Sequence, residues 1–395
     1  MPICATRGVV LTRATCDWAT YDEKGIRREP RTAHERGISV TSLVDYRSNR
    51  IVQLMQEPVE RRDAAWLRES LQQAVLLELA TLPPYLCGLW SIKDPVQDEG
   101  VFNAIREIVF DEMSHLGLAG NLLTTIGGFP HLSDERTAPA YPGPLPGGVR
   151  PDLTVSLSGL TKNSLDMYAR IEEPDHPIAK ADTYTSIGAF YSAVLAAFRE
   201  HPELITGSHQ LTRNMAHHGQ GNTIVAIGNL ADVEAAIGVI KEQGEGTSAS
   251  PENPHPGDAG ELAHYYVFRE IYHGRKLVKT SENPDRWEFV GDRIPMPRCR
   301  PMATVPSGGW GTTGVSAPDA DTRRLLDEFN HVYSEMLRLL EAAWKADLPA
   351  TRKDLLNRAV HQMSDLQRRA PTLMDRPLPG GSGETYGPEF RYVPV

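Results

Sequence analysis

Ionisable residues at core positions of a helix are the feature that most restricts how this chain can fold. Apolar residues recur at steps of three and four between residues 97 and 126, which predicts one helix closed by a pair of glycines. Glu112 and His115 lie on the apolar stripe, three residues apart and therefore on one helical face. Because an unpartnered carboxylate is costly to bury, the fold must bring a cation or strong hydrogen-bond donors to this stripe. Metal coordination is one solution.

A second Glu-x-x-His pattern occurs at Glu261 and His264, in another predicted helix at about 260–275. Glu78 stands among leucines in a third predicted helix, which starts near residue 61 and is expected to end at the Pro83-Pro84 pair. In ferritin-like carboxylate proteins, two helices each contribute a Glu-x-x-His pair and two others each contribute one Glu. A single Glu-x-x-His pair usually lies on the protein surface, but two such pairs on apolar stripes favour a metal centre.

The fourth carboxylate is open to several assignments. Glu245 is preferred because it ends the predicted helix that precedes His264, while Glu234 and Glu200 remain alternatives. His217-His218 stands in a polar segment and is expected to be solvated rather than to bind metal. Carboxylates with imidazoles suit iron or manganese, whereas structural zinc favours thiolates, so we expect two iron ions with manganese as the alternative. The predicted ligands are Glu78, Glu112, His115, Glu245, Glu261 and His264.

The remaining pattern predicts a mainly α protein in three parts. They are an extended or short-stranded N-terminal arm at 1–60, a ferritin-like four-helix bundle at 61–280, and a C-terminal extension at 281–395 with two helices packed on the bundle. The Pro- and Gly-rich residues 129–160 predict the long crossover of such a bundle. Further helices are predicted at 162–173, 184–200, 230–243, 319–346 and 351–370, with a small hairpin within 281–315.

Charge and cysteine usage narrow the partners. The net charge of -10 argues against a general nucleic-acid or anionic-membrane surface, so we expect a small-molecule substrate. The four cysteines are scattered, the first residues lack the order of a signal peptide, and no run of 18 apolar residues occurs, so a cytoplasmic protein is expected. A homodimer is an option that the sequence leaves open.

Several longer motifs carry a family resemblance over about residues 60–395. They are LLELATLPPYLCGLWSIKD, DEMSHLGLAGNLLTTIGGFP, YPGPLPGG, IKEQGEG, ELAHYYVFREI and YGPEFRYVP. Together they resemble the ferritin-like domain of bacterial iminophenylpyruvate dimer synthases, a family with members in indolocarbazole and violacein pigment pathways. The chain looks like a stand-alone member, so the haem-linked imine coupling of the pigment enzymes is not expected of it.

The resemblance implies that the six predicted ligands fall where this domain places its inward acidic and histidine residues, with Glu245 in the QGEG motif. One departure is Ala189, which stands where members of the family often carry a Glu, and it would reduce the site if that Glu were a ligand.

These features predict a di-iron oxidase or oxygenase that uses O2 or peroxide on an amino-acid-derived small molecule in specialised metabolism. Tyr85, Tyr191 and Tyr265 are expected to be core residues that could line a substrate pocket. Two alternatives are a non-catalytic ferritin-like module that binds metal or a partner protein, and a manganese enzyme that disproportionates peroxide.

Overall fold

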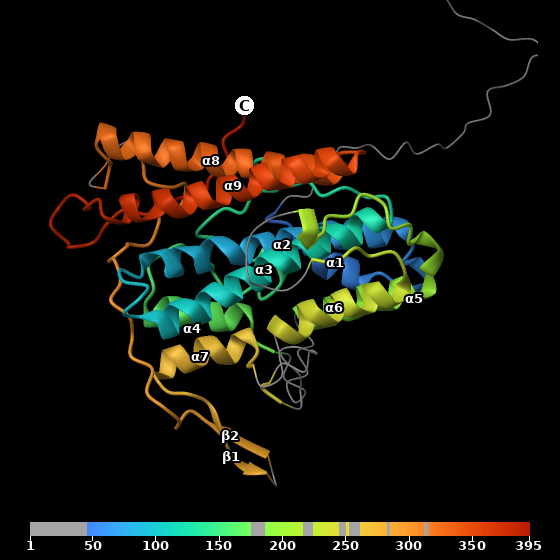
Figure 1. Cartoon of the computed structure of the whole chain (residues 1–395), viewed down its shortest axis with the longest axis horizontal. Coiled ribbons are helices and arrows are strands. Elements are labelled where there is room, and N and C mark those ends of the chain that lie inside the picture. The colour runs from blue at the N-terminus through green and yellow to red at the C-terminus, as the bar shows by residue number, and fades with distance from the viewer. Residues whose placement is uncertain are drawn as a thin grey trace, which may run out of the picture. The chain divides into compact units, whose positions relative to one another are not determined.

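Two long antiparallel helices form the centre of the fold in the computed structural model of the chain (Figure 1). They are α2 (Ala64–Ser91) and α3 (Glu99–Thr125), joined by a short loop. The Asp63 side chain accepts hydrogen bonds from two backbone amides at the start of α2 and so caps it. The structure describes residues 46–174, 186–215, 224–244, 250–252, 261–282, 285–311, 314 and 316–395.

Helix α2 continues through Pro83 and Pro84, so the predicted end at this pair is wrong. Proline cannot donate to the carbonyl one turn earlier, which leaves the oxygen of Ala80 without its helical partner. The hydroxyl of Tyr141 donates to that oxygen at 2.7 Å. Pro83 frees the Leu79 carbonyl in the same way, so the Tyr141 hydrogen bond replaces one of the two helical hydrogen bonds that the prolines remove, and the helix continues.

The third and fourth positions of the bundle are each filled by two shorter helices placed end to end. Helices α4 (Lys162–Ile171) and α5 (Ile187–Glu200) both contact α2, whereas α6 (Leu230–Gly244) and α7 (His264–His273) both contact α3. Figure 1 shows α4 beside α7 at one end of the bundle and α5 beside α6 at the other. The fold is therefore the predicted mainly helical, ferritin-like bundle, with a break in the middle of two of its four positions.

The crossover between α3 and α4 contains no α-helix, as predicted. It is fixed to the C-terminal part of the chain by the Glu341 carboxylate, which accepts hydrogen bonds from the backbone amides of Leu132 and Ser133. Short 3-10 turns occur within the crossover and elsewhere, at Val59–Arg61, Pro146–Gly148, Pro202–Leu204 and Arg213–Met215.

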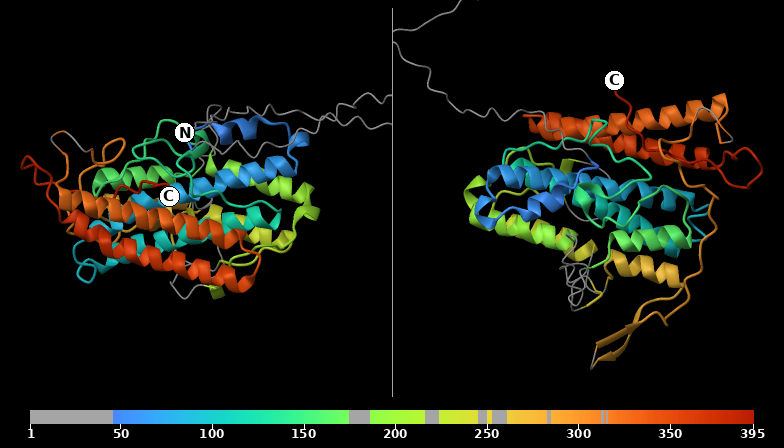
Figure 2. Two further views of the ribbon diagram at one scale, coloured as in Figure 1. Left: turned by 90° about the horizontal axis from the view of Figure 1, so that it is seen from above. Right: turned by 180° about the vertical axis from the view of Figure 1, so that it is seen from behind.

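A C-terminal pair of helices packs on the bundle, which is the arrangement expected for the extension. Helices α8 (Ala320–Lys345) and α9 (Pro349–Met374) lie along one side of it in Figures 1 and 2. The approach is close, because a Cβ at Gly120 of α3 would lie 2.3 Å from the Trp344 ring of α8. Strands β1 (Val278–Glu282) and β2 (Asp285–Glu288) form the predicted small hairpin.

The N-terminal arm is described only from residue 46. Residues Arg50–Gln56 form helix α1. The prediction of an extended or short-stranded arm is therefore wrong for this part of it. The indole nitrogen of Trp66 donates to the Leu54 carbonyl at 2.9 Å and ties α1 to α2.

Helix α2 is also long and apolar enough to cross a membrane by length and composition alone. The apolar part of the helix is entirely buried within the fold. A central helix covered by other elements on every side has this composition in any large bundle, so burial accounts for it.

Candidate metal centre

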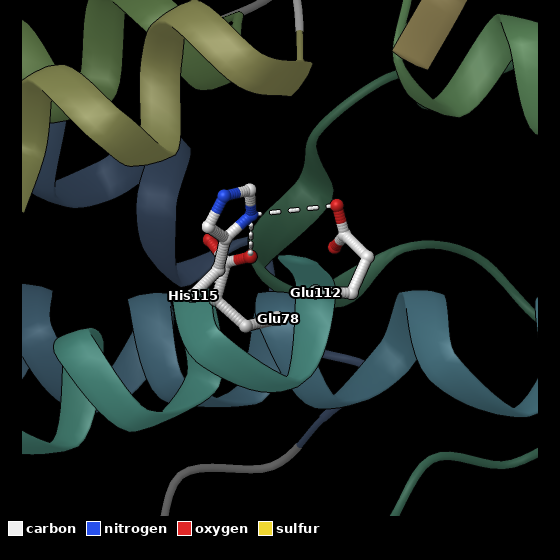
Figure 3. Close-up of side chains that lie close together, drawn as sticks. All are labelled: Glu78, Glu112 and His115. Atoms are coloured by element: carbon white, nitrogen blue, oxygen red, sulfur yellow. Dashed lines mark ion pairs between the residues drawn. The ribbon is translucent and has the colours of Figure 1, made fainter. Parts of the chain in front are cut away.

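The first candidate ligands come from the two continuous helices. Glu78 of α2 and Glu112 and His115 of α3 are all buried. The His115 Nδ1 atom lies 3.4 Å from Glu112 Oε1 and 3.8 Å from Glu78 Oε2. Figure 3 shows the imidazole turned toward both carboxylates. The prediction that Glu112 and His115 lie on one buried face of their helix is confirmed, and Glu78 of α2 lies beside them.

The other ligands come from the broken helices. Glu172 caps the C-terminus of α4, and His264 is the first residue of α7. Both side chains are buried, and His264 Nδ1 lies 3.0 Å from Glu112 Oε1. The breaks in the bundle thus present one carboxylate and one imidazole toward the same glutamate of α3.

Five side chains therefore make two overlapping groups of donors that share Glu112. We call Glu78, Glu112 and His115 position 1, and Glu112, Glu172 and His264 position 2. The donor atoms of each group lie within 4.8 Å of one another. A metal ion bonds such donors at about 2.0–2.2 Å, so a single ion can reach all three atoms of a group after small adjustments.

Both imidazoles are oriented by an oxygen atom on the side away from the carboxylates. His115 Nε2 lies 2.8 Å from Gln243 Oε1, and His264 Nε2 lies 3.3 Å from Asp111 Oδ2. An oxygen acceptor there keeps the proton on Nε2, so in the neutral ring the lone pair is on Nδ1. In both rings Nδ1 is the atom that faces the shared glutamate.

Hydroxyl groups fix the three carboxylates. Tyr191 donates to Glu78 Oε1 and Tyr85 donates to Glu172 Oε1, both at 2.5 Å. Thr81 donates to Glu112 Oε2 at 2.7 Å. Each carboxylate keeps a second oxygen for a cation, and its orientation is set before any ion binds.

Protons take the place of cations when no metal is bound. Burial raises the pKa of Glu78 to about 8 and that of Glu172 to about 7, and the charge of Glu112 adds to both rises. Burial would also raise the pKa of Glu112, but His115 and His264 hold it well below its usual range. The metal-free centre therefore keeps charge low by protonating its outer carboxyls.

The imidazoles are shifted in the complementary direction. Burial disfavours the charged form of His115, yet the charge and hydrogen bond of Glu112 outweigh burial and raise the pKa to about 9. Burial acts in the same way on His264, but its contacts with Asp111 and Glu112 raise the pKa well above the ordinary value. Protons on Nδ1 are the ones that an incoming ion would displace.

The residues fit a pair of divalent cations. In the ionisation states that bind metal, three buried carboxylates and two neutral imidazoles would carry an excess negative charge that a low-dielectric interior does not tolerate without cations. The buried His264 Nδ1 lies 3.0 Å from Glu112 Oε1, so a nitrogen donor and an oxygen donor already face each other at position 2. All donors are oxygen or nitrogen, which suits iron or manganese.

The structure does not bring every predicted ligand to this centre. Glu261 is exposed and precedes α7, so it does not form a helical Glu-x-x-His pair with His264. Glu234 pairs with Arg199 at the surface, and Glu200 is exposed. Glu245 and His217-His218 lie outside the described residues.

The remaining predicted positions have clear surroundings. Tyr85 and Tyr191 are buried beside the centre, where they act on its carboxylates. Tyr265 is half-buried and contacts the Tyr266 ring and the Arg269 guanidinium. Ala189 is exposed on α5, whereas Tyr191 of the same helix contacts the centre through Glu78.

Glu172 is the candidate ligand that the sequence analysis missed. Leu165, Tyr168 and Glu172 recur at steps of three and four, and the first two are buried. This carboxylate therefore stands on an apolar stripe as Glu112 does. The same criterion that selected Glu112 could have found it.

Comparisons with known proteins agree with this architecture. Dichlorochromopyrrolate synthase of Lentzea aerocolonigenes is 25% identical over 377 residues, covering 82% of this chain and 35% of the relative. The 2-imino-3-(indol-3-yl)propanoate dimerase of Chromobacterium violaceum is 25% identical over 380 residues, covering 91% of this chain and 33% of the relative. The chain thus spans about a third of the length of these curated relatives.

The fold also matches a solved structure. The crystal structure of a ferritin like protein from Caulobacter vibrioides superposes with a TM-score of 0.51 and 22% identity, covering 77% of this chain and 92% of the other. A family model described as ferritin-like matches residues 71–273, just over half of the 395 residues and a span that holds all five clustered ligands. The chain belongs to the ferritin-like family.

Proposed function

We propose that the protein is a metal-dependent oxidoreductase that binds two iron ions and uses O2 or peroxide to oxidise an amino-acid-derived small molecule. The observation that carries this proposal is the sharing of Glu112 by two buried donor groups, each with two carboxylates and one imidazole. A shared carboxylate would hold two ions close together, so that both could supply electrons to one molecule of O2 or peroxide.

The chain's own residues prepare the centre for that chemistry. Bound iron would supply the electrons that reduce O2 or peroxide. His115 and His264 offer Nδ1 because their Nε2 protons are held by oxygen acceptors. Tyr191 and Tyr85 hold the two outer carboxylates, and burial of all five ligands excludes bulk water.

The names of the relatives support the substrate class. One is named for a dimerase of an imino acid that carries an indole ring, and the other for a synthase of a chlorinated compound that contains pyrrole. Both names refer to aromatic nitrogen compounds, and the imino acid is an amino acid that has lost two hydrogens. Since this chain matches only about a third of each relative, the substrate class is part of the proposal.

Two other functions use the same residues. A manganese enzyme that disproportionates peroxide needs a carboxylate and imidazole centre of this kind, and a non-catalytic module would use it only to hold the fold together. The donor atoms are compatible with all three, so the deciding property is redox turnover.

The test is metal loading followed by oxygen uptake. The purified metal-free chain is loaded anaerobically with Fe²⁺, its metal content is measured, and O2 consumption is then followed with an electrode. We expect about two irons per chain and rapid O2 uptake in the presence of a reductant. Peroxide disproportionation by the manganese form alone would select the first rival, and bound metal without any turnover would select the module.

A matched pair of variants on α3 controls the test. Glu112→Gln removes the shared carboxylate and should lower the metal content of both positions. Glu107→Gln removes an exposed carboxylate from the same helix and should leave metal content and O2 uptake unchanged. Similar behaviour of the two variants would contradict the assignment of Glu112.

A further inference from the structure

The two imidazoles of the centre are held by chemically different partners. His264 Nε2 faces the carboxylate of Asp111, whose side chain is 21% exposed. His115 Nε2 faces the neutral amide of Gln243, which is buried at the end of α6. Position 2 therefore has an anionic partner behind its imidazole, and position 1 has a neutral one.

This difference changes the strength of the metal bond. A carboxylate that accepts the Nε2 proton pushes electron density into the ring and makes Nδ1 a stronger donor. It also adds a negative charge near the cation. An amide oxygen orients the ring in the same way but adds no charge, so it fixes position without the same gain in basicity.

The distances to the shared carboxylate also differ between the two positions. His264 Nδ1 lies 3.0 Å from Glu112 Oε1, whereas His115 Nδ1 lies 3.4 Å from that oxygen and 3.8 Å from Glu78 Oε2. The donors of position 2 include the closer pair of atoms. Either separation suits two donors of one ion, so a difference in affinity would come from Asp111 and Gln243.

We propose that the two metal positions are inequivalent, and that position 2 binds its ion first and more tightly because Asp111 supports His264 where Gln243 supports His115. Asp111 and Gln243 act through the imidazoles and are positioning residues. This inference rests on the proposed metal centre, which it deepens by assigning an order of loading to the two ions.

The experiment is a metal titration of the full, metal-free chain with Co²⁺, followed by calorimetry and by visible absorption. We expect two binding steps whose dissociation constants differ by about 10–100-fold, the range that partners behind a metal-bound imidazole usually control. The single-position variants Glu172→Gln and Glu78→Gln assign the steps, and they should abolish the tight and the weak step respectively.

Two reciprocal variants then test the cause. Asp111→Asn keeps the shape of the side chain and should weaken only the tight step, which brings the two constants together. Gln243→Glu adds a carboxylate behind His115 and should strengthen only the weak step. A gain of affinity cannot come from damage to the fold, so Gln243→Glu tests the inference even if Asp111→Asn unfolds.

The outcomes separate this inference from the proposed function. Two ions that bind the wild-type chain with equal constants, or variants that change both steps alike, would overturn the inference and leave the metal centre standing. A wild-type chain that binds no Co²⁺, Fe²⁺ or Mn²⁺ would overturn both.

Discussion

Glu172→Gln best tests whether the metal ligands are those proposed from the structure or those predicted from the sequence pattern. The change keeps the size of the side chain and an oxygen that can accept the Tyr85 hydrogen bond, but it removes the charge of one ligand of position 2. Position 1 does not contain Glu172. We therefore expect the metal content to fall from about two ions to about one per chain.

The same substitution should stabilise the metal-free protein. The pKa of Glu172 is raised from 4.5 to about 7, mainly by burial, and each pKa unit is worth about 1.4 kcal/mol. Above pH 7 the carboxyl is ionised in both states, so the folded state carries a penalty of about 3 kcal/mol that a glutamine does not have. Metal binding and metal-free stability should thus change in opposite directions.

The assays are elemental analysis of the loaded protein and urea unfolding of the metal-free protein at pH 8. Glu261→Gln is the matched control, because Glu261 belongs to the sequence pattern but is exposed in the structure. It should alter neither quantity. If Glu261→Gln lowered the metal content and Glu172→Gln did not, the proposed assignment of position 2 would be refuted.

Three further perturbations follow from the same geometry. Each of His115→Ala and His264→Ala should lower iron content sharply by elemental analysis while His217→Ala does not, and equal loading in all three would contradict the ligand assignment. Tyr141→Phe leaves the Ala80 carbonyl buried and unpaired, so it should lower the free energy of unfolding in urea by about 1–3 kcal/mol. A decrease below about 0.5 kcal/mol would mean that the carbonyl needs no donor from outside the helix. The pKa values of two glutamates and both histidines are raised in the fold, so the metal-free folded chain binds more protons than the unfolded chain. The melting temperature of the metal-free protein should therefore fall as pH rises from about 5 to about 9. A rise in melting temperature over this range would contradict these shifts. Since metal displaces those protons, the gain in melting temperature on loading should be larger at pH 8 than at pH 6.

Helical periodicity identified the buried ionisable residues that lie inside continuous helices. Glu78, Glu112 and His115 each interrupt an apolar stripe, and a helix has only one way to place such a stripe, which is toward the core. The fold class followed from the same stripes and from the Pro- and Gly-rich crossover. These inferences needed no knowledge of how distant segments meet.

The second Glu-x-x-His pattern misled because the start of α7 depends on tertiary contacts. Residues Glu252 and Leu262 form an antiparallel bridge, and the Ala263 amide donates to the Pro251 carbonyl. This pairing holds the segment around Glu261 in an extended form and delays the helix until His264. Spacing along the chain cannot show it, since the pairing joins residues 251–252 to residues 262–263 and depends on how the chain folds between them.

The sequence analysis did not predict Glu172 for a related reason. It stands at the very end of α4, where a helical stripe has only two or three apolar members and a carboxylate is usually solvated. Its burial depends on α7 packing against α4 across the break in the bundle. The apolar stripe was present in the sequence, but the partner that completes the site was not visible there.

Helix α3 contributes residues to both candidate metal positions, whereas Glu172 and His264 of position 2 lie at helix ends. Glu172 and His264 lack a helical turn on one side, so their own backbones orient them less firmly than an interior turn would. Asp111, Glu112 and His115 lie within five consecutive residues of α3, a continuous helix. Glu112 is the shared carboxylate and Asp111 contacts His264, so one rigid helix orients the ligands that come from the broken ones. The breaks in the bundle can therefore coexist with an ordered metal centre.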